Sequence, residues 1–218
     1  MFFDYHWIVY VIGFLAQGFF SARILVQWYK SEKAKSLKSP ASYWIFSLIG
    51  AYLMFVYGWC RDDFSIIFGQ MISYYIYVWN INAKNLWKKI PRIIRYIILL
   101  TPVAAFITVF KTQDFYGNFL NNDNIPIGLV IFGSVGQLIF TLRFVYQWFY
   151  SYRLKQSALP TSFWAISLVG SGLIIIYGII RKDPVLILGQ AIGFIAYIRN
   201  IWIGLNENKR NSETQKVK

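Results

Sequence analysis

The chain contains one long segment twice. Residues 12–81 align with residues 132–201 at a constant shift of 120 positions and without a gap, and 26 of the 70 aligned positions are identical. The identical positions include many polar residues and glycines, among them Gly13/Gly133, Trp28/Trp148, Pro40/Pro160, Ser42/Ser162 and Gly69/Gly189. Because chance similarity does not keep so many residues of these types in register, the sequence predicts two copies of one structural unit.

Apolar stretches follow one another along the whole chain. Hydrophobic residues make up 57% of the sequence and charged residues only 14%, whereas soluble domains carry about 25% charged residues. Roughly 20 apolar residues in a helix are enough to cross a bilayer. The sequence predicts seven membrane-spanning helices, at residues 7–28, 41–60, 64–82, 93–110, 125–149, 161–180 and 184–204.

The repeat determines how these seven spans are arranged. Each copy holds three spans, so two copies in direct succession would have opposite orientations in the membrane. The span at 93–110 has no counterpart in the repeat, and as a topological spacer it restores the orientation. Its Thr101-Pro102 pair removes one backbone hydrogen bond and is expected to kink the helix. We therefore expect an all-α membrane protein with a 3+1+3 plan of two parallel three-helix bundles.

This plan predicts four regions. Residues 1–83 form the first repeat, and 84–124 form a cytosolic loop, the linker helix and an outer loop. Residues 125–205 form the second repeat, and 206–218 form a polar, disordered cytosolic tail.

Basic residues predict the orientation. The net charge is +13, and most loop lysines and arginines fall after the first, third, fifth and seventh spans. Because positive loops stay in the cytosol, we expect the N-terminus outside and the C-terminus inside, in a multi-pass protein whose first span is retained. Since the charge lies in loops between apolar segments, we expect no nucleic-acid partner.

Several function classes are excluded by residue counts. Cys60 is the only cysteine and His6 the only histidine, so the chain has no Ser/His or Cys/His catalytic pair and no metal-ligand spacing. The few carboxylates do not pair within the apolar segments, and there is no Walker sequence. We expect no enzyme activity, metal or cofactor.

Two arginines are the first candidate binding residues. Arg23 and Arg143 each precede the end of a span by about five residues, near 8 Å inside the helix end. A guanidinium matches phosphate oxygens in a two-pronged way, so one arginine from each copy could hold a phosphate from two sides. The alternative is that both side chains reach toward the cytosolic surface. Gln27 and Gln147 lie one turn further on the same face.

A polar stripe follows the third span of each copy. Gln70, Ser73, Tyr77 and Asn80 share one helix face, and their counterparts are Gln190, Gly193, Tyr197 and Asn200. Such groups bind sugar hydroxyls, and the alternative is hydrogen bonding between helices. The mid-span residues Gln17 and Gln137 need either substrate or a neighbouring helix as a partner. Arg199 replaces Trp79 beside the stripe, so the two copies differ there.

The remaining motifs favour structural roles. The short outer turns contain four charged residues, Arg61, Asp63, Arg181 and Asp183. We expect them to form ion pairs that fix the turns, and the alternative is an outer gate. Tryptophans suit the cytosolic interface belt, and small residues of the second and sixth spans suit helix packing. The tryptophans are Trp28, Trp44, Trp148 and Trp164; the small residues are Ser47, Gly50, Ala51, Gly58, Ser167, Gly170, Ser171 and Gly178.

The motif R-x-x-x-Q-W, followed by P-x-S-x-W, R-x-D, G-Q and Y-x-x-N, resembles the lipid A biosynthesis N-terminal domain family. It reads from Arg23 to Asn80 and again from Arg143 to Asn200. That family is similar to the PQ-loop and SWEET/SemiSWEET sugar carriers, whose unit is a three-helix bundle. Its domain can precede a lipid-A-disaccharide synthase region, which we do not find in this sequence.

The resemblance implies handling of a lipid-linked sugar for envelope glycolipid or lipid A biosynthesis in a bacterial inner membrane. We expect a carrier or flippase for an anionic, polyprenyl-phosphate-type lipid, with Arg23 and Arg143 at the phosphate and the Gln/Tyr/Asn stripes at the sugar. Membrane lipid and a membrane glycosyltransferase are the expected partners. One alternative is a non-catalytic membrane subunit of a glycosyltransferase, and another is a SWEET-like facilitator of a free sugar.

Overall fold

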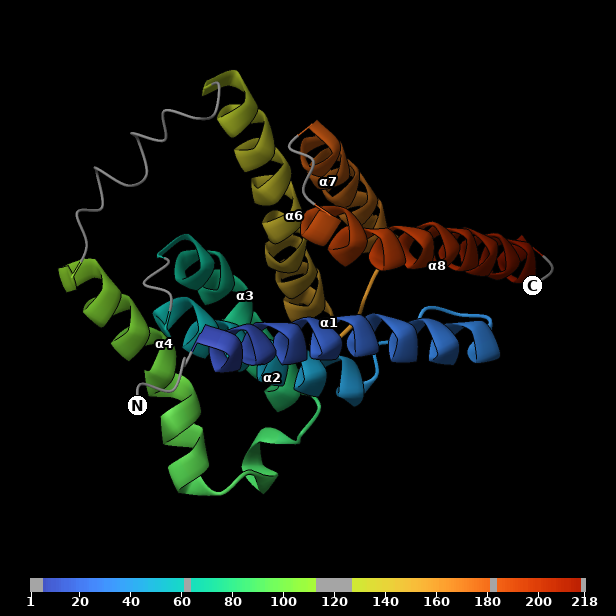
Figure 1. Cartoon of the computed structure of the whole chain (residues 1–218). Coiled ribbons are helices and arrows are strands. Elements are labelled where there is room, and N and C mark those ends of the chain that lie inside the picture. The colour runs from blue at the N-terminus through green and yellow to red at the C-terminus, as the bar shows by residue number, and fades with distance from the viewer. Residues whose placement is uncertain (1–5, 61–63, 113–126, 181–183, 217–218) are drawn as a thin grey trace. The chain divides into compact units, whose positions relative to one another are not determined.

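The computed structural model describes residues 6–60, 64–112, 127–180 and 184–216. Within these ranges the chain forms seven α-helices, one short 3-10 helix and no strand (Figure 1). The elements are α1 (His6–Ala34), α2 (Ala41–Cys60), α3 (Phe64–Ala83), η1 (Trp87–Lys89), α4 (Arg92–Thr112), α6 (Ile127–Leu154), α7 (Thr161–Ile180) and α8 (Pro184–Lys216). The predicted all-α class is confirmed for the described residues. Six predicted spans fall within one α-helix each, and the described part of the span 125–149 falls within α6.

Two of the described helices are long and apolar enough to cross a bilayer, Val11–Ala34 in α1 and Thr161–Ile180 in α7. A shorter apolar stretch covers Ala41–Tyr57 of α2. The number of described α-helices equals the predicted number of spans. That all seven cross a membrane, in a SWEET-like 3+1+3 arrangement, stays a prediction.

The predicted disorder of the polar tail is wrong. Helix α8 continues through the tail to Lys216. The side chain of Glu207 accepts a hydrogen bond from the backbone N–H of Leu37 at 2.8 Å, and Arg210 donates to the backbone carbonyl of Lys35. Composition gave no sign of these contacts, which hold the extension against the loop after α1. Lys, Glu, Gln and Arg also favour the helix intrinsically.

The chain divides into two compact units. The first comprises Met1–Ala22 and Trp44–Ile125, and the second comprises Arg23–Tyr43 and Pro126–Lys218. The boundary therefore cuts α1 between Ala22 and Arg23, so that the second unit contains the second repeat together with the end of α1 and the loop that follows it. The four regions predicted from the repeat stay a prediction.

In the first unit, a tyrosine compensates for the proline of α4. Pro102 has no N–H to donate to the carbonyl of Ile98, four residues earlier. The hydroxyl of Tyr74, which is fully buried on α3, donates to that carbonyl at 2.9 Å. The hydroxyl of Tyr75 donates to the next carbonyl, that of Leu99, at 3.1 Å. The ribbon of α4 bends midway, as the proline predicted (Figure 1), and the linker helix is anchored to α3 at the bend.

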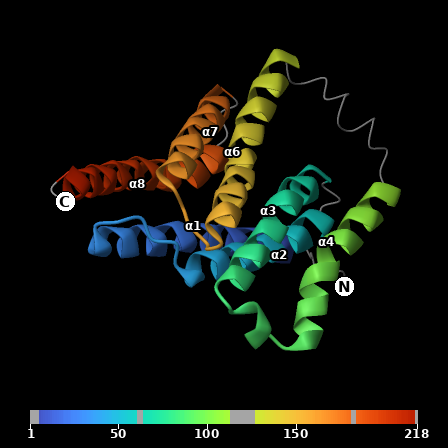
Figure 2. The same ribbon diagram turned by 180° about the vertical axis from the view of Figure 1, so that it is seen from behind.

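In the second unit, α7 packs against both α6 and α8 (Figure 2). The closest approach is at Gly170, where a Cβ would lie 2.8 Å from the Cα of Phe140 on α6. Ser167 and Ser171 beside it are fully buried. These contacts confirm the predicted small-residue packing of this helix, which permits backbones to approach closely.

We predict that Tyr74→Phe lowers the free energy of unfolding by about 1–3 kcal/mol, because the carbonyl released by Pro102 would be left without a donor. The measurement is unfolding of the purified protein by heat or denaturant. Tyr96→Phe is the matched control, since Tyr96 lies on α4 and is 65% exposed. Equal stabilities of the two variants would contradict this role of Tyr74.

Candidate functional site

Arg23 and Arg143 lie in the interior of the second unit, and both guanidiniums contact the same aromatic ring. They are 5% and 2% exposed. The guanidinium carbon of Arg23 is 5.4 Å from the centre of the Phe144 ring, and that of Arg143 is 4.6 Å from it. These distances limit the separation of the two carbons to 10.0 Å. The structure thus brings together the two arginines that the repeat predicted as partners.

Aromatic rings surround both guanidiniums. Arg143 stacks on Phe140 at 3.2 Å from its centre and lies 5.8 Å from Phe163 and 5.9 Å from Tyr197. Arg23 lies 5.4 Å from Tyr43. The negative face of a ring attracts a cation, by about 0.5–1 kcal/mol at exposed sites and about 2 or more when desolvated. We call these seven residues the arginine cluster: Arg23, Tyr43, Phe140, Arg143, Phe144, Phe163 and Tyr197.

The electrostatics of the arginine cluster favour an anion. Two unit positive charges 10 Å apart repel each other by about 1.7 kcal/mol at an effective dielectric of about 20. Guanidiniums remain charged at any physiological pH, so proton release cannot remove this repulsion. An anion between them would attract both, and phosphate oxygens match the fork of N–H donors. The charges of the cluster are therefore complementary to an anionic group, and the cluster contains no pair of groups suited to acid–base chemistry.

Gln27 and Gln147 fasten the loops that follow their helices. The amide nitrogen of Gln27 lies 2.9 Å from the hydroxyl of Ser31 and 3.3 Å from the carbonyl oxygen of Lys38. The amide nitrogen of Gln147 lies 2.7 Å from the hydroxyl of Ser151 and 2.9 Å from the carbonyl oxygen of Ala158. These partners occupy equivalent repeat positions. The contacts favour a structural role for both amides, and their predicted contact with substrate stays a prediction.

Asn80 and Asn200 occupy equivalent positions in the two copies and make equivalent hydrogen bonds. Each is fully buried and donates to the carbonyl four residues earlier, Ile76 at 2.9 Å and Ala196 at 2.8 Å. The side-chain oxygen of Asn200 also accepts a hydrogen bond from Gln27 at 2.9 Å. That bond joins α1 to α8. Hydrogen bonding between helices is the alternative to sugar binding for the polar stripe that contains Asn200.

The tyrosines of the two stripes pack on tryptophans. Tyr77 lies 6.2 Å from the ring centre of Trp44, and Tyr197 lies 5.9 Å from that of Trp164. Both tryptophans are fully buried, so their predicted place in the interface belt is wrong. Their rings fill the interior, which the P-x-S-x-W motif alone did not reveal. Trp28 and Trp148 are partly exposed, as an interface position requires.

The other predicted residues do not belong to the arginine cluster or lie outside the described ranges. Gln17 and Gln137 are exposed, and Gln70 and Gln190 are half-buried. The outer-turn residues Arg61, Asp63, Arg181 and Asp183 lie outside the described residues. Substrate contact by the four glutamines stays a prediction, and so does the role of the four outer-turn residues as turn ion pairs or an outer gate.

Sequence reasoning missed the rings of the arginine cluster. Phe140 precedes Arg143 by three positions, a spacing that places the two side chains on one helix face. Phe144 follows Arg143 directly, and this spacing gives no such signal. The equivalent of Phe144 in the first copy is Ile24, so one ring serves both arginines. The partner of Arg199, Glu32, was also missed.

Comparison with known proteins finds the repeat. The family model described as Lipid A Biosynthesis N-terminal domain matches residues 12–82 and again 132–202, more than half of the chain. A Chlamydia pneumoniae protein named lipid-A-disaccharide synthase is 32% identical over 214 residues, which cover 93% of this chain and 34% of that protein. The protein of the same name from Chlamydia trachomatis serovar D is 31% identical over 212 residues, 91% of this chain and 34% of that protein.

The chain thus spans about one third of the length of the curated relatives that it matches. No solved structure matches it.

We predict that Gln27→Ala and Asn200→Ala are coupled. Each variant removes one side of the same buried hydrogen bond, so the double variant should lose less stability than the sum of the single losses, by about 0.5–3 kcal/mol. A double-mutant cycle on the free energy of unfolding measures this. The matched control is a cycle of Asn200→Ala with Gln17→Ala. Because the side chain of Gln17 is exposed, the stability losses of these two variants should be additive. Additivity in both cycles would contradict the bond.

Proposed function

We propose, because this chain belongs to the Lipid A Biosynthesis N-terminal domain family, that it is a membrane carrier for an anionic lipid-linked sugar in the lipid A or envelope glycolipid pathway. The observation that carries the proposal is the pair of buried guanidiniums that both contact the ring of Phe144. Each copy of the family's domain contributes one of them. A neutral free sugar would not require two such charges.

The proposed ligand group is a phosphate or pyrophosphate. Arg23 and Arg143 each present planar N–H donors, and an anion between them would cancel the repulsion of their charges. The surrounding rings exclude water, which strengthens every charge interaction in the site. The arginine fork orients the phosphate, while Tyr43 and Tyr197 supply ring faces and hydroxyls for an attached sugar.

The membrane setting follows from the apolar helices and the distribution of charge. The proposed protein is a multi-pass protein of a bacterial inner membrane, with the N-terminus outside and the C-terminus in the cytosol. In the proposed mechanism, movement of the two copies relative to each other changes the spacing of the two arginines, and so the affinity for phosphate on each side.

A second candidate function is that of a non-catalytic membrane module that positions a glycosyltransferase. The similarity to proteins named lipid-A-disaccharide synthase, of which this chain spans a third, favours it. In that function the basic loops after α1 and α3 would bind the partner, and the arginine cluster would serve stability or lipid anchoring.

We predict that Arg23→Ala and Arg143→Ala each reduce retention of a polyprenyl-phosphate sugar at least tenfold, because either change removes one side of the phosphate contact. Arg→Lys at either position should restore only part of it, since an ammonium lacks the planar fork. Native mass spectrometry of protein purified from its membrane measures the retained lipid.

The matched control for these variants is Arg153→Ala. Arg153 is exposed, lies on α6 like Arg143, and also contacts a ring, that of Phe149 at 4.2 Å. Full retention in the double variant Arg23→Ala/Arg143→Ala would eliminate the carrier proposal. Circular dichroism and unfolding temperature identify any variant that fails through misfolding.

The second candidate predicts a different outcome. Exchange of Lys30, Lys33, Lys88 and Lys89 for Gln should then abolish co-purification of a glycosyltransferase, while the Arg23 and Arg143 variants keep it. Pull-down from the native membrane, followed by mass spectrometry, measures this. A glycosyltransferase that is never recovered with the wild-type chain would exclude this function.

A further inference from the structure

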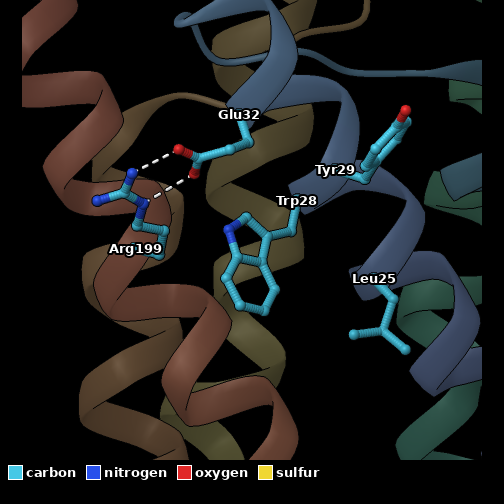
Figure 3. A pocket seen from close by; sticks show the side chains of 5 residues that line it. All are labelled: Leu25, Trp28, Tyr29, Glu32 and Arg199. Carbon is cyan, nitrogen blue, oxygen red and sulfur yellow. Dashed lines mark hydrogen bonds and ion pairs between the residues drawn. The ribbon is translucent and has the colours of Figure 1, made fainter.

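A groove opens on the surface of the second unit, between α1 and α8. Its volume is about 440 Å³, within the range of roughly 300–1,000 Å³ typical of ligand sites. Figure 3 shows its five lining residues, Leu25, Trp28, Tyr29, Glu32 and Arg199. The first four occur at i, i+3, i+4 and i+7, so they line one face of α1.

The groove is polar at one end and apolar along the rest. Glu32 and Arg199 form an ion pair, with the Nε of Arg199 2.8 Å from a carboxylate oxygen. The ring of Trp28 projects from α1 beside this pair, and Leu25 lies further along the helix (Figure 3). From Glu32 to Leu25 the helix rises about 10 Å. This order, two charges followed by about 10 Å of apolar surface, is that of a lipid with its headgroup at the interface.

The two charges select the kind of headgroup. Arg199 uses its Nε and Nη2 to bind Glu32, and its Nη1 donates no hydrogen bond to any residue in the described ranges. Both side chains are partly exposed, 37% for Arg199 and 45% for Glu32. A phosphate would meet the open edge of Arg199. A purely anionic lipid would also be repelled by Glu32, whereas a lipid that carries an ammonium as well would satisfy both charges.

We propose that this groove is a binding site for a zwitterionic phospholipid with a phosphoethanolamine headgroup. The phosphate binds Arg199, the ammonium binds Glu32, and one acyl chain lies along Leu25 and Trp28. The indole and phenol of Trp28 and Tyr29 suit the level of the headgroup.

Neither of these charges has a charged counterpart in the other copy of the repeat. The counterparts of Glu32 and Arg199 are Tyr152 and Trp79, and the counterpart of Leu25 is Val145. The apolar character is thus common to both copies, while the headgroup charges occur only once. We therefore expect one such lipid per chain, at the groove that α1 and α8 form.

This inference rests on the membrane setting of the proposed function, but not on the carrier activity. The lipid in the groove is distinct from the proposed cargo at Arg23 and Arg143. Loss of cargo binding in the Arg23 and Arg143 variants would leave the groove lipid in place.

The test is native mass spectrometry of the full chain released from nanodiscs with equal amounts of phosphatidylethanolamine and phosphatidylglycerol. The wild type should retain one phosphatidylethanolamine in preference to phosphatidylglycerol by about tenfold. Glu32→Gln and Arg199→Gln should each abolish the preference. Lys33→Gln, which removes an exposed charge next to Glu32, should keep it.

Three outcomes would overturn the proposal. They are a preference for phosphatidylglycerol, an unchanged preference in the Glu32→Gln/Arg199→Gln variant, and equal retention of both lipids by the wild type. Release of the protein from native membranes by alkaline carbonate without detergent would overturn the membrane premise, and with it the carrier function. Failure of the carrier function alone would instead appear as unchanged cargo retention in the Arg23 and Arg143 variants.

Discussion

Buried polar groups must be matched, and this requirement explains more of the molecule than its apolar content does. A chain that is 57% hydrophobic has many ways to bury carbon. It has few ways to bury two guanidiniums, since an uncompensated charge costs several kcal/mol. The rings around Arg23 and Arg143 offset part of that cost, and two of these cation–π contacts lie where α1 meets α6 and where α6 meets α7. The same requirement places Tyr74 opposite the carbonyl that Pro102 leaves without a donor.

The repeat gives the two copies a common internal design. Gln27 and Gln147 bind equivalent seryl hydroxyls and loop carbonyls, and Trp44 and Trp164 receive equivalent tyrosines. A motif that recurs with polar residues in register invites a functional interpretation. Here half of that motif fixes a loop and fills the interior, because a buried amide or indole must have partners whether or not a ligand exists.

The helices could be predicted from the length of the apolar stretches. The pairing of Arg23 with Arg143 could be predicted from their equivalent positions in the repeat. The surroundings of the arginines could not, since Tyr43 and Phe163 come from helices whose packing no periodicity specifies. The polar extension of α8 shows the same limit. Its composition favoured disorder, but Glu207 and Arg210 are held by backbone groups of a loop some 170 residues away in sequence.

Divergence between the copies is informative about function. Residues retained in both copies would serve what the copies do together, and Arg23 with Arg143 is the retained pair of charges that the structure buries. Residues that differ between the copies would serve contacts that only one copy makes. Tyr74 and Tyr75, whose hydroxyls bind carbonyls of α4, correspond to Phe194 and Ile195, which carry no hydroxyl. Glu32 and Arg199 correspond to Tyr152 and Trp79. The copies thus share the buried arginine pair, whereas the charged groove takes one charge from each copy and has no counterpart formed by the other two positions.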